Sequence, residues 1–411
     1  MSSIKEQVLA QQGQYKESDD KYLSVLKQYN CNLNDEEVAA AVKKILDEKV
    51  AENETMEVKK FLFGSIELTS LHTEDTEESI LKMIEKVNQF AKDYPQLPHV
   101  ATVCTEQVLA QQGQYKESDD KYLSVLKQYN CNLNDEEVAA AVKKILDEKV
   151  AENETMEVKK FLFGSIELTS LHTEDTEESI LKMIEKVNQF AKDYPQLPHV
   201  ATVCTYPNFA GLISQSLEVD GVEIAVVSGN FPSSQTFIEV KIAETAMAIK
   251  DGATEVDIVM PVGKFFSEDY EGLCDDIQEL KETCGEHKMK CILETGNLKN
   301  CSNIMKASIL AMYSGSDYIK TSTGKEKVSA TPEAAYVMCQ AIKAYYEKTG
   351  IQIGFKPAGG INTVHDAVVY YTIVKEVLGE KWLTNQWLRL GTSRLTNLLL
   401  SEILGKEIKY F

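Results

Sequence analysis

Hydrophobic and polar positions alternate in regular blocks over the C-terminal half of the chain. Short apolar runs, of the length typical of buried strands, are separated by longer segments with helical spacing. The predicted strands after Tyr206 are Glu223–Ser228, Glu255–Met260, Lys290–Thr295, Asp317–Ser322, Ile353–Pro357 and Trp387–Gly391. The predicted helices are Thr236–Lys250, Tyr270–Cys284, Asn303–Tyr313, Pro332–Glu347, Val364–Leu378 and Leu395–Leu404. This alternation predicts a parallel sheet built from strand–helix units.

The segment before Tyr206 contributes two more predicted strands, Phe161–Leu171 and Val200–Thr205, with a predicted helix over Thr176–Tyr194 between them. Eight such strands in residues 161–411 favour a closed (β/α)8 TIM barrel over an open doubly wound sheet. No G-x-G-x-x-G motif follows the first strand, which weighs against a dinucleotide-binding fold. We therefore expect an α/β barrel at 161–411, preceded by a helical N-terminal extension at 106–160.

The chain also contains an internal repeat, because Glu6–Thr105 recurs without a substitution as Glu106–Thr205. Only 411 − 100 = 311 residues are therefore independent sequence. The second copy continues directly into Tyr206, whereas use of the first copy in the barrel would loop out a whole repeat, at a cost of roughly 2.5–3 kcal/mol. We predict that residues 1–105 are an extra copy and not an independent domain. This copy is expected to be loosely ordered or to pair with another chain by exchange.

Composition narrows the classes of partner. The formal net charge is −21, and it is −21 + 8 = −13 without the extra copy, which carries 19 acidic and 11 basic residues. An acidic chain is not expected to bind nucleic acid or anionic membranes in general. No run reaches the roughly 18 apolar residues of a membrane span. The nine cysteines include no C-x-x-C pair, which favours reduced thiols in the cytoplasm, and the histidines show no metal-ligand spacing.

Candidate chemistry lies at the carboxyl ends of the strands, where barrels carry their active sites. Lys320 and Lys356 lie in neighbouring predicted strands, and lysine is unusual there because such strands are buried on both faces. A nearby cation and desolvation both lower the pKa of an amine, which makes it a nucleophile towards carbonyl groups. Asp257 is then placed to transfer protons. The alternative is a cluster of salt bridges that only stabilises the barrel.

Glycine-rich loops after the last three predicted strands indicate a phosphate site. Gly324-Lys325, Gly359-Gly360 and Gly391-Thr392-Ser393 occupy positions where barrels often bind phosphate through backbone N–H groups. The alternative is that these glycines merely permit tight turns. Taken together with Lys325 and Ser393, the three loops favour phosphate binding.

Four segments, ATVCTYP, GATEVDIVMP, DYIKTSTGK and IGFKPAGGI, together resemble the deoxyribose-phosphate aldolase family of class I aldolases. The resemblance covers about Phe161–Phe411. It implies that Lys320 forms the Schiff base, that Lys356 lowers the pKa of that amine, and that Asp257 works with Lys356 as acid and base. The substrate-binding positions that it implies are Glu167, Thr169, Cys204, Thr323, Gly324, Lys325, Gly359, Gly360 and Ser393.

The activity implied by this resemblance is reversible cleavage of 2-deoxy-D-ribose 5-phosphate to glyceraldehyde 3-phosphate and acetaldehyde. It would need no metal or other cofactor. The implied partners are a small phosphorylated sugar and an aldehyde, and the implied assembly is a homodimer. The alternatives are another Schiff-base barrel aldolase with a different donor, and a non-catalytic barrel disabled by the duplication.

The chain departs from the family pattern at two positions. The family usually reads D-L-T-T-L in its first strand, but here the segment is Glu167-Leu168-Thr169-Ser170-Leu171. One extra methylene group can move a carboxylate by roughly 1 Å, which matters in a positioned site. Arg394 stands where the family often has a serine, so one phosphate contact is lost or becomes a charged one.

Overall fold

The computed structural model describes residues 33–105, 121–392 and 394–411. These residues form two compact units, one made of 33–70 with Leu81–Thr105, and the other of Leu71–Ile80 with 121–392 and 394–411. Ser393, one of the positions predicted to bind phosphate, lies outside the described residues.

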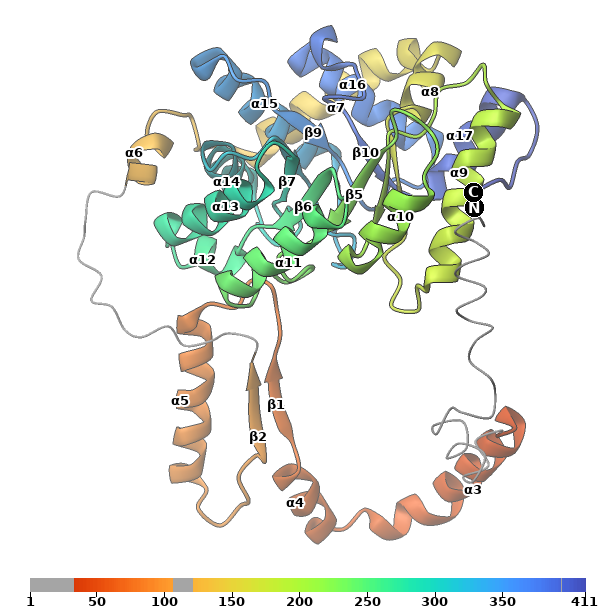
Figure 1. Cartoon of the computed structure of the whole chain (residues 1–411). Coiled ribbons are helices and arrows are strands. Elements are labelled where there is room, and N and C mark those ends of the chain that lie inside the picture. Colours follow the sequence, from red (N-terminus) through yellow and green to blue (C-terminus); the bar gives the residue numbers. More distant parts are fainter. Residues whose placement is uncertain (1–32, 106–120, 393) are drawn as a thin grey trace. The chain divides into compact units, whose positions relative to one another are not determined.

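The second unit contains an eight-stranded parallel sheet with the order β10-β3-β4-β5-β6-β7-β8-β9 (Figure 1). Phe355 N donates to Trp387 O and Gly391 N donates to Pro357 O. The segment of β9 therefore pairs with the segment of β10, and this pairing closes the ring. The predicted TIM barrel is confirmed. Its strands are β3 (Ile166–Thr169), β4 (Thr202–Thr205), β5 (Glu223–Val227), β6 (Glu255–Val259), β7 (Lys288–Ile292), β8 (Tyr318–Lys320), β9 (Gly354–Lys356) and β10 (Leu390–Thr392).

Helices connect these strands and surround the ring (Figure 1). Thr363 begins one of them as a capping box, because its Oγ1 accepts from Asp366 N at 3.1 Å while Asp366 Oδ2 accepts from Thr363 N at 2.9 Å. None of the helices in the described part of the chain is long and apolar enough to cross a bilayer. The barrel helices are α9 (Glu177–Asp193), α10 (Ala210–Ser216), α11 (Ile238–Lys250), α12 (Val262–Phe266), α13 (Tyr270–Cys284), α14 (Cys301–Tyr313), α15 (Pro332–Thr349), α16 (Val364–Leu378) and α17 (Arg394–Leu404).

Three helices precede the barrel in the same unit: α6 (Lys121–Leu126), α7 (Asp135–Asn153) and α8 (Met156–Phe163). Helix α7 packs against α15 and α16, and α8 packs against α16 and α17. Polar contacts also join α7 to the barrel, because Asp135 Oδ1 accepts from Cys301 N at 2.9 Å and the Asn153 amide donates to Thr372 Oγ1 at 3.2 Å. The helical extension is therefore packed onto the barrel.

The predicted strand Phe161–Leu171 begins too early. Helix α8 continues to Phe163, and β3 covers only Ile166–Thr169. Thr155 caps this helix by accepting from Val158 N at 3.3 Å, and the apolar run that follows is the buried end of the helix. A short apolar run does not distinguish a buried helical turn from a strand. The predicted strand Lys290–Thr295 also ends early, at Ile292, two residues before the left-handed φ of 54° at Glu294.

The described part of the first copy, residues 33–105, has the same order of helices and strands as the matching part of the second copy. In the first copy they are α3 (Asp35–Asn53), α4 (Met56–Gly64), β1 (Glu67–Ser70), α5 (Glu77–Asp93) and β2 (Thr102–Thr105), and the two strands form a parallel pair. The packing of the two copies differs: Leu62 is 57% exposed, whereas its counterpart Leu162 is fully buried. In the second copy, α16 and α17 pack against the helix that carries Leu162. The same sequence therefore contributes to the core only where the rest of the barrel surrounds it.

Deletion of residues 6–105 is expected to leave the stability of the barrel unchanged, because none of its eight strands comes from that segment. Since the copies are identical, deleting either one gives the same 311-residue chain (411 − 100). Both tryptophans, Trp382 and Trp387, lie in the barrel unit, so urea unfolding followed by tryptophan fluorescence reports on the barrel. A change well above about 0.5 kcal/mol in its free energy of unfolding would show that the first copy supports it.

Candidate active site

Three predicted catalytic residues meet inside the barrel. Lys320 and Lys356 are direct partners in the β8–β9 register, and both reach Asp257 on β6. The Lys320 ammonium donates to Asp257 Oδ2 at 2.8 Å and the Lys356 ammonium donates to the same oxygen at 2.6 Å. Their exposed fractions are 4%, 0% and 0% in the order Lys320, Lys356, Asp257. One carboxylate oxygen thus links two lysines in a site from which water is nearly excluded.

Glu167 lies in the same group. Its Oε2 accepts from the Lys356 ammonium, and its Oε1 lies 3.4 Å from Lys290 Nζ and 3.4 Å from Arg389 Nη1. Both of its oxygens are therefore paired with cations. Glu167 is one methylene group longer than the aspartate of the family pattern, and its carboxylate is held by these three cations. A direct contact of Glu167 with substrate stays a prediction.

Three further charged residues lie beside these four, and the sequence analysis assigned them no role. Lys290 of β7 lies 2.6 Å from Glu255 Oε2 and 3.0 Å from Asp257 Oδ1. Arg389 binds Glu255 through two nitrogens, with Nη1 at 3.3 Å from Oε2 and Nη2 at 3.2 Å from Oε1. The available signal was the one used for Lys320, namely a charge in a strand buried on both faces. The sequence did not single out these three residues because they lie before the carboxyl ends of the strands, where active sites of barrels are expected.

These seven residues form what we call the ionic cluster: Lys290, Lys320, Lys356, Arg389, Glu167, Glu255 and Asp257. All are at most 4% exposed. The cluster holds four cationic and three anionic side chains, so full ionisation leaves one unbalanced positive charge inside the barrel. Buried charges are tolerated when they are paired, and an unpaired one is expensive. Loss of one proton from one of the amines would balance the cluster at three against three.

Opposite charges in the cluster shift the pKa values of Asp257, Lys290 and Lys356 in the direction that keeps each group ionised. Burial opposes ionisation of Asp257, but the three surrounding ammonium groups outweigh it and hold the pKa of this carboxyl well below its usual value. Burial likewise acts against charge on Lys356, yet the carboxylates of Asp257 and Glu167 raise its pKa above the usual value. The pKa of Lys290 is raised well above its usual value because its neighbouring carboxylates outweigh burial in the same way. Lys356 and Lys290 are therefore held as cations.

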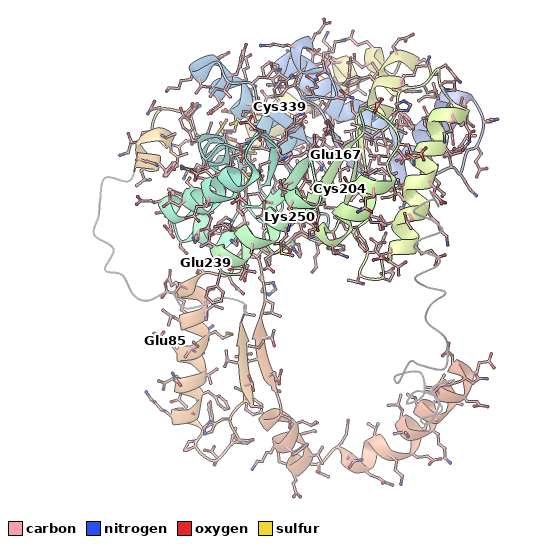
Figure 2. The ribbon with its side chains drawn as sticks, viewed as in Figure 1. Glu85, Glu167, Cys204, Glu239, Lys250 and Cys339 are labelled. Carbon is pink, nitrogen blue, oxygen red and sulfur yellow. The ribbon has the colours of Figure 1, made fainter. Side chains whose placement is uncertain are left out.

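Cys204, on β4, lies next to Glu167, on β3 (Figure 2). Its Sγ and one carboxylate oxygen each of Glu167 and Asp257 lie within 4.8 Å of one another, a spacing that a metal ion could use. The donors do not suit a metal, however, because ammonium groups already pair both carboxylates and burial raises the pKa of the Cys204 thiol to about 11. Thr169 Oγ1 donates to the Glu167 carbonyl oxygen at 2.9 Å and so lies at the same strand end.

The structure brings the glycine loops after β8 and β9 together and places them beside Gly391, which lies within β10 and not in the predicted loop after it. A Cβ atom on Gly359 would lie 3.3 Å from Gly324 Cα, and one on Gly391 would lie 2.7 Å from Ala358 Cβ. Gly324, Gly359 and Gly360 have left-handed φ angles of 79°, 76° and 76°, which favour glycine. The loops thus form one surface of closely spaced backbone at the end of the barrel, as a phosphate site requires.

Lys325 and Thr323 lie at the edge of this surface. The Lys325 ammonium donates to Leu171 O at 2.6 Å, which places it over the loop after β3. Thr323 is buried, accepts from Lys325 N at 3.1 Å, and donates through Oγ1 to Glu294 Oε2 at 2.5 Å. Thr323 is therefore committed to a protein partner through its hydroxyl hydrogen.

Arg394 is exposed at the start of α17.

Glu255→Gln should flatten the acid dependence of stability. Lys290 and Arg389 outweigh the effect of burial and lower the pKa of Glu255 to about 2 from 4.5. Because the folded-state pKa is the lower one, the stabilisation is complete above pH 4.5 and is lost as the pH falls towards 2. Wild type should lose about 2 kcal/mol between pH 5 and pH 3 from this group, as measured by urea unfolding, and the variant should not.

Glu239→Gln, on the exposed face of α11 (Figure 2), is the matched control and should keep the wild-type dependence. Equal slopes for Glu255→Gln and wild type would contradict the pairing of Glu255. At neutral pH the Glu255→Gln variant should be less stable than wild type by roughly 3–5 kcal/mol, because Lys290 and Arg389 each lose a buried partner.

The chain is similar to known aldolases over the barrel. The model of the DeoC/LacD family aldolases matches residues 161–380. The deoxyribose-phosphate aldolases of Homo sapiens and Bos taurus are each 38% identical over 240 residues, which is 56% of this chain and 76% of each relative. A candidate deoxyribose-phosphate aldolase of Caenorhabditis elegans is 38% identical over 266 residues, 64% of this chain and 87% of that protein.

A solved structure supports the fold. The apo form of a candidate deoxyribose-phosphate aldolase from Toxoplasma gondii ME49 matches with a TM-score of 0.55 and 22% identity, over 61% of this chain and 98% of that one. The matched family segment, residues 161–380, spans more than half of the chain and contains Lys320, Lys356 and Asp257. This chain belongs to the DeoC/LacD family of aldolases.

Proposed function

We propose that this aldolase reversibly cleaves 2-deoxy-D-ribose 5-phosphate into glyceraldehyde 3-phosphate and acetaldehyde, with Lys320 as the Schiff-base nucleophile. The observation that carries the proposal is the hydrogen bond from Lys320 Nζ to Asp257 Oδ2 at 2.8 Å, inside a buried cluster with one more cationic than anionic side chain. Lys320 has the largest exposed fraction of the seven, 4%, at the mouth of the barrel. The names of the human and bovine relatives support the substrate.

The first step forms a carbon–nitrogen bond. The neutral amine of Lys320 attacks C1 of the open-chain sugar, and the carbonyl oxygen leaves as water after it has gained protons. Asp257 Oδ2 is in hydrogen-bond contact with both lysine nitrogens, so one proton of the leaving water can come from the Lys320 amine through Asp257 and the second from the Lys356 ammonium. The product is a protonated imine on Lys320.

The second step breaks the C2–C3 bond. Asp257 accepts the proton of the C3 hydroxyl, C3 becomes the aldehyde carbon of glyceraldehyde 3-phosphate, and the bonding electrons move through C2 to the imine nitrogen. The resulting enamine is protonated at C2 by the acid–base pair of Asp257 and Lys356, and water then hydrolyses the imine to release acetaldehyde. Because the iminium group accepts the electrons, the proposed chemistry needs no metal.

The substrate phosphate is proposed to bind the loops after β8, β9 and β10. Gly324, Gly359 and Gly360 would supply backbone N–H groups, and Lys325 would supply charge. Ser393 is retained in this proposal from the sequence. Thr169 and Cys204 are proposed to border the aldehyde end of the substrate.

The domain organisation proposed here assigns all catalytic residues to the barrel at 161–411 and the helical extension to 106–160. Residues 1–105 repeat Glu67, Thr69 and Cys104, but Lys320 and Lys356 have no second copy. We further propose a homodimer in the cytoplasm, in keeping with the family resemblance. No disulfide joins the eight cysteines that the structure describes, which supports a reducing compartment.

Borohydride reduction in the presence of acetaldehyde should attach one ethyl group to Lys320. Intact mass and peptide mapping measure the adduct, with EDTA present throughout because no metal is required. Lys320→Leu should abolish both the adduct and sugar cleavage, whereas Lys250→Leu, at an exposed position of α11, should leave both unchanged. An adduct on another lysine, or none on wild type, would refute the assignment.

Lys356→Leu should lose most activity and move the acid limb of the pH–rate profile to higher pH. Removal of this buried cation leaves Asp257 and Glu167 with less positive charge beside them, so the proton on the neighbouring amine is held more tightly. The loss of kcat should be about a hundredfold or more, the range for an acid–base group. An unshifted acid limb would contradict the electrostatic role of Lys356.

A further inference from the structure

Glu294 is a buried carboxyl group that the mechanism does not use. It lies two residues beyond the end of β7, is fully buried, and adopts a left-handed φ of 54°. Residues in such sparsely populated backbone regions cluster at functional sites. Asn297 N donates to the Glu294 carbonyl oxygen at 2.9 Å, so the backbone turns sharply here.

The two carboxylate oxygens of Glu294 differ in their contacts. Oε2 accepts from Thr323 N at 3.2 Å and from Thr323 Oγ1 at 2.5 Å. Oε1 is buried and accepts no hydrogen bond in the described structure. An unpaired buried carboxylate oxygen is costly, and it is rare in a native protein unless a ligand or water meets it.

Two more buried polar atoms without partners lie near Glu294, one just after β7 and one just after β8. Thr295 Oγ1 and Ser322 Oγ are likewise buried and have no hydrogen-bond partner in the described structure. Thr295 N donates to Thr321 O at 2.9 Å, which joins the ends of β7 and β8. Three of the seven buried side-chain atoms that lack a partner in the described residues therefore lie at the ends of β7 and of β8, the strand that carries Lys320.

The place of Glu294 indicates which part of the substrate it would meet. Leu293, the residue before Glu294, donates through its N–H to Lys320 O at 2.9 Å, and Thr323, which binds Oε2, directly precedes Gly324 of the proposed phosphate loop. Glu294 thus lies between the imine position and the phosphate position. In 2-deoxyribose 5-phosphate the groups between C1 and the phosphate are the C3 and C4 hydroxyls. Asp257 is assigned to the C3 hydroxyl, which leaves C4.

We propose that Glu294 Oε1 accepts a hydrogen bond from the C4 hydroxyl of the sugar phosphate and makes the enzyme specific for acceptor aldehydes that carry this hydroxyl. Glu294 is then a specificity-determining residue in contact with substrate. The inference rests on the proposed function. Burial raises the pKa of Glu294, and a hydroxyl donor at Oε1 would stabilise its charged form in the complex.

The test runs the reaction in the direction of synthesis with acetaldehyde as donor. Two acceptors are compared: glyceraldehyde 3-phosphate, and 3-phosphooxypropanal, which lacks only the hydroxyl in question. Wild type should prefer glyceraldehyde 3-phosphate in kcat/KM by about tenfold or more, the usual effect of a hydrogen bond to a charged group. Glu294→Ala should bring this ratio close to one, and Glu294→Gln, which keeps an acceptor oxygen, should retain part of it.

Two controls separate this role from a structural one. Glu239→Ala, at an exposed position of α11, should keep the wild-type ratio. Borohydride trapping of acetaldehyde on Lys320 should be unchanged in both Glu294 variants, because acetaldehyde has no hydroxyl to bind. A Glu294→Ala protein that traps acetaldehyde and keeps the wild-type preference would overturn the inference. A wild type that traps no acetaldehyde would instead overturn the proposed function.

Discussion

The arrangement inside the barrel depends on the sharing of one oxygen, Asp257 Oδ2, by Lys320 and Lys356. Two ammonium groups held this close to each other in a dry interior repel strongly unless an anion lies between them. The shared carboxylate supplies that anion and also holds the two lysine nitrogens on either side of one oxygen. The parallel register of β8 and β9 makes the arrangement possible, because it sets the two lysines directly opposite each other.

The remaining charges of the ionic cluster stabilise this contact from the side of the barrel opposite the mouth. Lys290 joins Asp257 to Glu255, and Arg389 joins Glu255 to Glu167. Every anion therefore faces more than one cation, and this multiple pairing makes a buried group of seven charges tolerable. Removing any one partner leaves an uncompensated charge, so the geometry of the proposed catalytic residues and the stability of the barrel are linked through the same contacts.

The sequence was sufficient to predict the barrel and the three residues at its centre, because lysine in a strand buried on both faces is exceptional and therefore informative. It was insufficient for Lys290, Glu255 and Arg389, because these three residues lie before the carboxyl ends of the strands, where the catalytic residues of barrels are expected. The boundary at Phe161–Phe163 was wrong because an apolar run fits a helix end as well as a strand. The repeat shows why local sequence cannot decide burial: Leu62 and Leu162 have identical neighbours for many residues on either side, yet one is 57% exposed and the other fully buried.

The buried polar groups of the barrel are of two kinds: those whose partners lie within the protein, and those that keep an atom without a partner in the described structure. The charges of the ionic cluster are paired with one another within the protein. Glu294, Thr295 and Ser322, at the ends of β7 and β8, keep atoms without a partner. A site built this way needs the substrate to complete its hydrogen bonds, and an acceptor aldehyde that lacks a hydroxyl leaves a buried oxygen unpaired. Discrimination then follows from the cost of that unpaired group, which is how a site built for a hydroxyl rejects its absence.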